Sequence, residues 1–381
     1  MAMEPPTPFL LRNPGACMAV TSLIDQHRAL DAKFTQIAPE HVVVNHYGDP
    51  LAEHRAVARG AGLIDRYYRS KLRVAGGDAV RFLNGQVTND LAHLEVGHGV
   101  YALATDAKGH CLGDPYIYRF PDSLMVDLEP SATNPTVASW RHHIIADDVT
   151  LTDITGDMHT LSVVGPRALE AIRAVADTEV GELAPLAFAG VGIGGQQVVV
   201  ARSDFTGGPA YDLFLWTQAL IPVWNRLLAA PEKVRPTPFG DIALSSLMAE
   251  AGVVRYGRDL TDKNLPQEAG IEERAVSYTK GCYLGQEVIC RIHSQGHPTR
   301  TLVGLVIAAT EEGEPTAGDK LIHEGKEVGW LTQVVNSPTL GRPLALGYVK
   351  RDLALPSTTL RARNRKGKEV HLEVIALPVR A

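Results

Sequence analysis

The last part of the chain constrains its fold most, because the residue pattern changes near His297 and Pro298. Beyond this point, short runs alternate apolar and polar residues, and turns rich in Gly, Pro and Asn separate them. The runs cover residues 301–308, 320–325, 327–335, 343–349, 358–364 and 369–377. Such a series of short strands, with almost no helix between them, predicts a small antiparallel barrel or sandwich over residues 298–381.

Residues 41–297 mix strands and helices without a strict βαβ rhythm, so an α+β fold fits better than a doubly wound sheet. Helical spacing followed by a Gly predicts a helix over residues 51–65. Residues 78–94 predict a helix, a break at Gly85 and a second short helix. Alternation on both sides of residues 106–109 predicts a β-hairpin.

The first 40 residues are predicted to be an irregular lead-in, because the start is rich in Pro. A weak helical pattern covers residues 23–37. We expect ordered structure to begin near His41, where the sequence HVVVN predicts a short strand.

Composition and charge point to a soluble globular protein. Apolar residues make up 45% of the chain and charged residues 21%, and the formal net charge is −6. No stretch approaches the ~20 apolar residues of a membrane span, and the start does not resemble a signal peptide. The four cysteines are too few for a disulfide scaffold. We therefore expect a cytoplasmic protein, with no membrane partner and without nucleic acid as its default partner.

The most unusual segment is residues 279–300, TKGCYLGQEVICRIHSQGHPTR. The second half of this segment has apolar residues on one helical face, which predicts a helix whose first turn begins just after Cys282. Lys280 lies two residues before Cys282. A thiol beside a lysine at a helix N-terminus has a lowered pKa, which favours a reactive or ligand-facing role. The spacing alone favours the alternative, a small buried Cys that fills a corner between loop and helix.

The same segment contains a possible set of metal ligands. Cys282, Cys290, His293 and His297 include the spacing C-x-x-H-x-x-x-H. Gly296 would break a helix that aligned the two histidines, and no second pair of cysteines is present. We expect no metal here.

Two further places could carry chemistry. Glu250 lies at the margin of the apolar stripe of a helix that begins at Asp241 and ends at Gly252. A carboxylate at a buried margin needs a partner, which an N–H-rich heterocycle could supply, although the pattern alone favours a half-exposed Glu that makes a surface hydrogen bond. Tyr101 and Asp114 flank the predicted hairpin, where turn or surface roles are common.

Four segments occur in an order that resembles one known family. They are HYGDPLAEHRAVARGAGLID, FLNGQVTNDL, EAGVVRYGRDL and LPQEAGIEERAVSYTKGCYLGQEV. Over roughly residues 42–381 the chain is similar to the family of the glycine-cleavage T-protein and the YgfZ-type proteins. The signature K-G-C-Y-x-G-Q-E, from Lys280 to Glu287, is typical of the YgfZ branch. The resemblance implies two mixed α/β subdomains around a central channel that holds tetrahydrofolate, followed by a C-terminal antiparallel β-barrel.

The resemblance also implies roles for particular residues. Glu250 matches a glutamate that binds the pterin ring, and Tyr101 matches a tyrosine that lines the same pocket. Phe205 stands where the T-protein has a pocket tyrosine. The signature residues Lys280, Cys282, Tyr283 and Gln286 match the YgfZ branch directly.

Departures from the T-protein pattern bear on catalysis. T-proteins carry a paired Asp-Asp where this chain has Gly113 and Asp114, so the first carboxylate is missing. General acid–base groups contribute ~10²–10⁴-fold in rate, so this loss argues against an efficient aminomethyltransferase. Asp114 or Asp106 could substitute. Met248 also replaces a T-protein arginine.

The resemblance therefore predicts a tetrahydrofolate-binding protein that supports assembly or repair of iron–sulfur clusters. Its expected partners are client enzymes, including tRNA-modifying ones, or cluster-assembly factors. One alternative is a folate-dependent aminomethyltransferase or demethylase, and another is a non-catalytic folate-sensing module. Direct nucleic acid binding is not expected, although Arg291, His293, His297 and Arg300 could form a local basic patch.

Overall fold

The computed structural model describes residues 23–38, 41–308, 314–363 and 367–379. Its α-helices are α1 (Ile24–Ala29), α2 (Pro50–Arg59), α3 (Ala79–Gln86), α4 (Pro130–His143), α5 (Ala168–Arg173), α6 (Thr217–Leu228), α7 (Asp241–Ala251), α8 (Glu272–Ala275) and α9 (Gln286–Gln295). One 3₁₀ turn, η1, spans Arg351–Leu353.

The strands of the first two thirds of the chain are β1 (Lys33–Ala38), β2 (His41–His46), β3 (Gly62–Asp65), β4 (Ser70–Ala75), β5 (Gly99–Tyr101), β6 (Ala104–Thr105), β7 (Cys111–Gly113), β8 (Tyr116–Arg119), β9 (Leu124–Leu128), β10 (Thr150–Asp153), β11 (Met158–Val164), β12 (Phe188–Ile193), β13 (Gln196–Ser203), β14 (Ala210–Trp216) and β15 (Thr237–Pro238). The C-terminal strands are β16 (Arg300–Ile307), β17 (Lys320–His323), β18 (Lys326–Ser337), β19 (Arg342–Lys350), β20 (Thr359–Arg363) and β21 (Glu369–Ile375).

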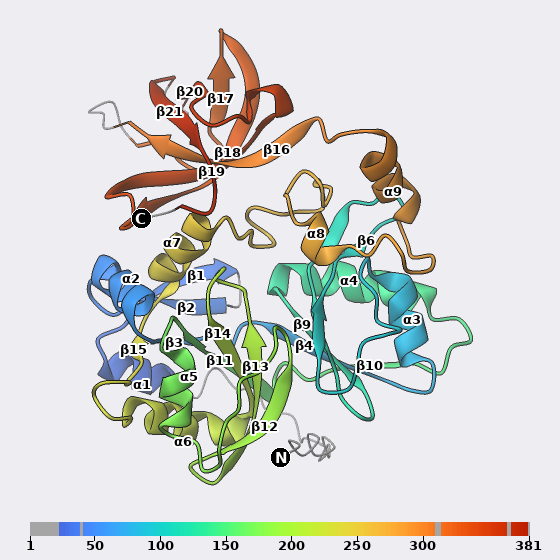
Figure 1. Cartoon of the computed structure of the whole chain (residues 1–381), viewed down its shortest axis with the longest axis vertical. Coiled ribbons are helices and arrows are strands. Elements are labelled where there is room, and N and C mark those ends of the chain that lie inside the picture. The colour runs from blue at the N-terminus through green and yellow to red at the C-terminus, as the bar shows by residue number, and fades with distance from the viewer. Residues whose placement is uncertain (1–22, 39–40, 309–313, 364–366, 380–381) are drawn as a thin grey trace.

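Two sheets organise the part of the chain before the barrel (Figure 1). One has five strands in the order β10-β4-β9-β8-β5, and the other has six in the order β12-β13-β14-β11-β3-β15. Strand β3 belongs to the second sheet and β4 to the first, so the short segment between them, residues 66–69, passes from one sheet to the other. This crossing brings charged residues of the segment between the two sheets.

The predicted hairpin is present as β6 and β7, which pair Ala104 with Gly113 and Thr105 with Cys111. Its turn is held by the side chain of Asp106, whose Oδ1 accepts hydrogen bonds from the backbone N–H groups of Lys108 and His110 at 2.8 and 2.9 Å. Asp106 is therefore a turn residue, as its position in the sequence favoured.

The helix predicted over residues 51–65 is shorter than expected. It ends at Arg59, and residues 62–65 form β3 instead. The side chain of Asp49 caps its start by accepting from Leu51 N and Ala52 N. A side chain at Gly62 would lie 2.4 Å from Val57 and 2.7 Å from Phe239, so only glycine lets the strand pack this closely on α2.

The second half of the prediction for residues 78–94 was wrong. Helix α3 runs through Gly85 to Gln86, and residues 87–94 contain no helix. There, a side chain bonds the backbone in place of helical hydrogen bonds: Asn84 Oδ1 accepts a hydrogen bond from Leu91 N at 2.8 Å. Short polar side chains compete in this way with helical hydrogen bonds.

Regular structure also begins earlier than expected. Helix α1 and strand β1 precede His41, and β1 pairs antiparallel with β2. Buried His27 fixes this part, because its ring contacts the Asp65 carboxylate at 3.1 Å and the Tyr47 hydroxyl at 2.8 Å. The Pro-rich start, residues 1–22, lies outside the described residues.

The C-terminal domain is a closed antiparallel barrel in the order β16-β19-β18-β17-β20-β21, which confirms the predicted barrel. Alternate residues point inward along its strands, so Leu360 and Ala362 of β20 are buried while their neighbours are exposed. Each fully buried leucine of this core, such as Leu305 and Leu321, contributes about 1.5–3 kcal/mol by burial.

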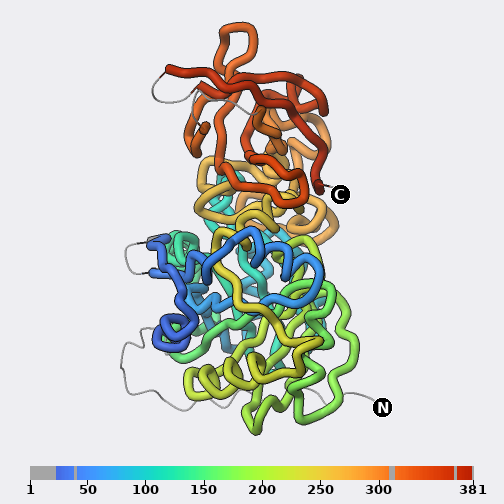
Figure 2. The backbone as a smooth tube through the Cα atoms, turned by 90° about the vertical axis from the view of Figure 1, so that its left-hand side faces the viewer, coloured from blue at the N-terminus to red at the C-terminus, as the bar shows by residue number. Residues whose placement is uncertain are grey.

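The barrel forms one end of the elongated molecule, and helix α7 lies between it and the two sheets (Figures 1 and 2). Helix α7 contacts β18 and β19 on the barrel side and α2 and β2 on the other. In the described ranges, none of the helices has the length and apolarity needed to cross a membrane.

Candidate functional site

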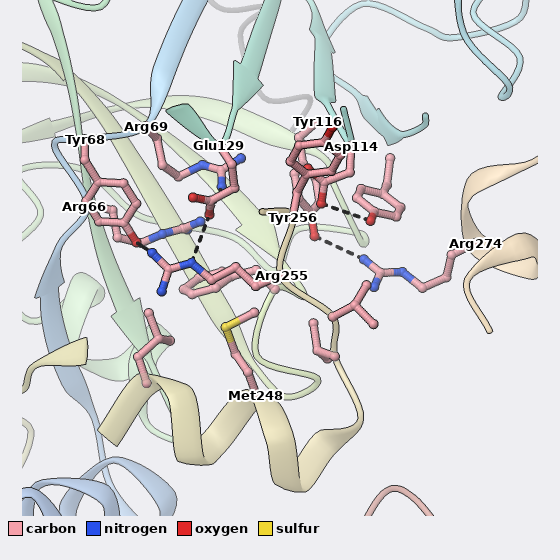
Figure 3. A pocket seen from close by; sticks show the side chains of 15 residues that line it. Arg66, Tyr68, Arg69, Asp114, Tyr116, Glu129, Met248, Arg255, Tyr256 and Arg274 are labelled. Carbon is pink, nitrogen blue, oxygen red and sulfur yellow. Dashed lines mark hydrogen bonds and ion pairs between the residues drawn. The ribbon is translucent and has the colours of Figure 1, made fainter. Parts of the chain in front are cut away.

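A small cavity lies between the sheets, helix α7 and the loop that follows α7 (Figure 3). The segment between β3 and β4 supplies Arg66, Tyr68 and Arg69, and the five-stranded sheet and its flanking loops supply Tyr101, Asp114, Tyr116 and Glu129. The remaining lining residues are Phe205, Leu244, Met248, Val253, Val254, Arg255, Tyr256 and Arg274. Charged and aromatic side chains thus dominate its wall.

Asp114 is the most unusual group in this wall. It follows β7 directly and is buried, and its Oδ2 accepts a hydrogen bond from the Tyr101 hydroxyl at 3.2 Å. Its Oδ1 has no hydrogen-bond partner among the described residues. Burial raises the pKa of Asp114 to about 7, against the lowering effect of the Arg69 guanidinium. A carboxyl group with this pKa can hold or release a proton near neutral pH.

Glu129, by contrast, is held as a carboxylate. Arg69 Nη1 donates to Glu129 Oε1 at 2.8 Å, and Arg255 Nε lies 3.6 Å from the same oxygen. Burial raises the pKa of Glu129, but Arg255 and Arg69 outweigh burial and leave it below its ordinary value. Two carboxyl groups in one cavity therefore differ in protonation, which is common where acid–base work is divided.

Arg69 is held in place from two sides and still offers a free donor. Its Nε donates to Asp127 Oδ2 at 2.8 Å, and its Nη1 to Glu129. Its Nη2 is buried and has no hydrogen-bond partner in the described part of the chain. Two lining residues, Arg69 and Asp114, therefore each carry a buried polar atom without a hydrogen-bond partner among the described residues.

Flat faces complete the wall. The rings of Tyr101 and Tyr116 lie 4.8 Å apart between centroids. The Arg66 guanidinium carbon lies 3.7 Å from the centroid of the Phe205 ring. Such faces suit a planar, polar ligand.

Arg255 fixes the loop that follows α7. It donates to Asp241 Oδ1 at 2.7 Å and to the Tyr68 hydroxyl at 3.2 Å. We expected Asp241 to cap α7, but the cap position is Gly240 and the Asp241 side chain pairs with Arg255. A larger and more open hollow shares Glu129, Arg255 and Tyr256 with the cavity and extends to Arg258.

The expected site residues fall into three groups. Tyr101, Phe205 and Asp114, which are far apart in the sequence, all line the cavity. Glu250 forms a second group, and the signature segment from Lys280 forms a third.

Glu250 is not among the lining residues of the cavity, contrary to its expected place in a pterin pocket. Its carboxylate is already satisfied by the protein. It faces His54 Nε2 at 2.8 Å and accepts from the hydroxyls of Ser337 and Thr339 and from Thr339 N at 3.1 Å. Ser337 ends β18, so Glu250 joins α7 to the barrel and to α2.

The signature segment also lies outside the cavity wall, since none of Lys280, Cys282, Tyr283 and Gln286 lines it. Lys280 Nζ donates to the carbonyls of Val87 and Asn89 at 2.7 and 2.8 Å, and to that of Asn84, which anchors the segment to the end of α3. Tyr283 is buried beside it, and Gln286 begins α9. Their expected role in binding folate is therefore not supported by position.

Cys282 is exposed, and it precedes the N-cap residue Gly285 by three positions, so it is not in the first turn of α9. A side chain at Gly285 would lie 2.5 Å from the carbonyl oxygen of Asp106. This glycine, with φ +83°, therefore lets the segment pack on the β6–β7 hairpin rather than on a ligand.

The possible metal ligands of this segment are not gathered together. In the described ranges, no group of three or more His, Cys, Asp or Glu side chains is arranged to hold a metal ion. His293 stacks on Tyr278 with ring centroids 3.7 Å apart. Arg300 pairs with Glu268 at 2.7 Å, so part of the basic patch considered above is already neutralised.

Sequence reasoning missed most of the charged wall: Arg66, Tyr68, Arg69, Tyr116, Glu129, Arg255, Tyr256 and Arg274. One signal was available. Asp127 interrupts the apolar run from Leu124 to Leu128, Glu129 follows it directly, and buried charges of this kind require partners. The sequence did not identify those partners.

Comparison with known proteins places this geometry in a family. The GCVT N-terminal domain matches residues 23–280, and the glycine cleavage T-protein C-terminal barrel domain matches residues 300–379. The chain therefore belongs to the GCVT family.

Curated relatives of known name cover most of the chain. An aminomethyltransferase of Shouchella clausii is 31% identical over 327 residues, which are 86% of this chain and 88% of the relative. An aminomethyltransferase of Herpetosiphon aurantiacus is 31% identical over 335 residues, 87% of this chain and 90% of the relative.

A solved structure has the same fold. The glycine cleavage system aminomethyltransferase T from Bartonella henselae superimposes with a TM-score of 0.83 and 24% identity, over 93% of this chain and 96% of that one. The predicted α+β architecture with a C-terminal antiparallel barrel is thereby confirmed.

Proposed function

We propose that this chain binds a reduced folate in the cavity and carries out one-carbon transfer there, with Asp114 as the group that exchanges a proton. One observation carries the proposal: a buried carboxyl group, with a pKa of about 7 and a free oxygen, in the cavity wall. The names of the relatives, which are aminomethyltransferases, support the same class of reaction.

The residues present fit a reduced folate. A pterin ring is flat and carries N–H donors and a carbonyl acceptor on its edge. The cavity offers the faces of Tyr101 and Tyr116, the free Asp114 Oδ1 as acceptor and the free Arg69 Nη2 as donor. When bound, the folate would supply the nitrogen atoms that carry a one-carbon unit.

The chain's own residues would orient the ligand and move a proton. Tyr101 holds the Asp114 side chain by its hydrogen bond to Oδ2, so Oδ1 stays directed away from this partner. Arg69 and Arg255 keep Glu129 ionised beside it. Asp114 would then act as the single proton carrier, in place of the paired aspartates of T-proteins.

Calorimetric titration with tetrahydrofolate, together with an assay for methylenetetrahydrofolate formation from an aminomethyl donor, tests this proposal. We expect binding in the micromolar range, ~8 kcal/mol, for the wild type. Asp114→Asn should keep binding and lose about 10²–10⁴-fold in turnover.

Asp106→Asn is the matched control, because Asp106 is a turn residue outside the cavity wall and its amide can still accept the turn hydrogen bonds. It should retain full turnover. Absence of tetrahydrofolate binding by the wild type would overturn the proposal. Binding without turnover in any variant would favour the folate-sensing module instead.

A second candidate is maintenance of iron–sulfur clusters, as in the YgfZ branch. The observation that favours it is the exposed thiol of Cys282, on a segment that Lys280 fixes through three backbone carbonyls. Its partners would be cluster-containing client enzymes, including tRNA-modifying ones, or assembly factors. A rigidly presented thiol could meet such a partner at the surface.

The activity of a cluster-dependent enzyme, in cells that lack this protein and receive a variant, tests this second candidate. Cys282→Ser should fail to support the enzyme, whereas Cys290→Ser, which changes the half-buried thiol of α9, should succeed. Equal support by both variants and by the wild type would exclude a role for the Cys282 thiol.

A further inference from the structure

Arg274 is the most exposed residue of the cavity wall, and we take its position as the mouth of the cavity. The other lining residues are buried, apart from the half-buried Val253, whereas the Arg274 side chain is 36% exposed. Arg274 lies on α8, in the segment that connects α7 to the barrel, and Figure 3 shows its side chain reaching toward Tyr116. A ligand longer than the cavity would therefore pass this residue.

The guanidinium of Arg274 sits over the inner wall. Its carbon lies 4.5 Å from the centroid of the Tyr101 ring, and its Nη2 donates to the Tyr116 hydroxyl at 3.1 Å. Tyr101 is also the residue that hydrogen-bonds Asp114. A ring placed beside Tyr101 and Asp114 would thus have its substituent next to Arg274.

The Arg274 guanidinium is already paired with a carboxylate of the protein, that of Asp204. Asp204 Oδ1 accepts from Arg274 Nη2 at 2.8 Å and from the Tyr116 hydroxyl at 3.2 Å. Asp204 directly precedes Phe205 in the loop after β13, so this pair joins two separate parts of the chain across the mouth.

This ion pair is weak enough to exchange. The two side chains are 36% and 44% exposed, and ion pairs of that exposure contribute little. A carboxylate on a bound ligand would meet the same guanidinium and the same hydroxyl, in a geometry that arginine binds well.

We propose that Arg274 binds a carboxylate of the ligand, and that Asp204 holds this position until the ligand displaces it. The inference rests on the proposed function, because it assigns Arg274 to the glutamate portion of a folate. Under this inference, Arg274 at the mouth of the cavity distinguishes a folate, which carries a carboxylate, from a pterin without one, and the inner wall does not.

Two probes separate the mouth from the inner wall: tetrahydrofolate, and 6-methyltetrahydropterin, which has no carboxylate. Calorimetric titration would be carried out with the wild type, Arg274→Met and Asp204→Asn. Arg274→Met should weaken tetrahydrofolate binding about tenfold, as expected for one charge-assisted contact. Asp204→Asn should tighten it about two- to fivefold, since a competing exposed ion pair is removed.

Asp204→Asn should change the affinity for 6-methyltetrahydropterin by no more than about twofold, and Arg274→Met should weaken it less than it weakens tetrahydrofolate binding, because Arg274 also contacts Tyr101 and Tyr116. Glu273→Gln is the matched control, because it alters the charge as Asp204→Asn does, next to Arg274 but in an exposed position outside the wall. Its affinities should equal those of the wild type.

If Arg274→Met and Asp204→Asn changed the affinities for both probes equally, or changed neither affinity, the proposed role of Arg274 and Asp204 would be wrong. The proposal of folate binding by the wild type would be unaffected by that result. Binding of neither probe by the wild type would instead remove the proposed function and this inference with it. The two failures are therefore distinguishable in one set of titrations.

Discussion

Asp114 owes its high pKa to position alone, since an exposed aspartate titrates near 3.9. Burial between β7 and β8 removes water from the carboxyl group, and the hydrogen bond from Tyr101 replaces that water only in part. The folded protein therefore binds this proton more tightly than the unfolded chain does.

This difference makes stability depend on pH. The contribution of Asp114 is fully present below about pH 4 and is lost as the pH rises through about 7, because the folded pKa is the higher one. We predict that the free energy of unfolding of the wild type falls between pH 5 and pH 8 by about 2–3 kcal/mol more than that of Asp114→Asn. Urea unfolding at the two pH values measures it, and identical pH dependence would contradict the raised pKa.

At the scale of helices and strands, the sequence pattern predicted those elements that depend mainly on interactions between residues close in the sequence. The barrel strands were recognised because a half-buried strand alternates, and the hairpin because Asp106 suits a turn. The predicted boundaries of the helices in residues 51–65 and 78–94 were wrong, because contacts with residues outside the helices decide them. Phe239 packs against Gly62, so residues 62–65 form a strand although their sequence continues the helical spacing. The Asn84 side chain accepts a hydrogen bond from Leu91 N, in place of a helical hydrogen bond.

The site shows the same division. Tyr101, Phe205 and Asp114 were named through resemblance, since each lies next to a recognisable motif, and all three line the cavity. Arg69 was not, because its partners Asp127 and Glu129 lie about 60 residues away, and its burial is intelligible only beside them. Glu250 does not line the cavity for a related reason: a buried carboxylate needs donors, and nothing in the sequence indicated that the barrel supplies them.

The whole molecule is held together around helix α7. Glu250 accepts from Ser337 and Thr339 of the barrel, and Asp259, further along, accepts from Thr332 at 2.7 Å and Gln333 at 3.2 Å. The loop between these two acidic residues carries Val253, Val254, Arg255 and Tyr256 of the cavity wall. The barrel thus fixes both ends of that part of the wall.

We predict that Glu250→Ala lowers the free energy of unfolding by about 2–4 kcal/mol, because it leaves several buried donors without an acceptor. Thermal or urea unfolding measures the change. Thr339→Val removes only one side-chain donor of the set and should cost less than half as much. A loss below about 0.5 kcal/mol for Glu250→Ala would show that the joint contributes little.

The closure of the barrel also limits how other proteins can bind this chain. Each of its six strands is paired on both sides, with β16 joined to β21, so the described barrel offers no unpaired strand edge. A partner cannot extend this domain by adding a strand of its own. Recognition there must rely on side chains and loops, whereas the open sheets still end in edges, such as exposed β10.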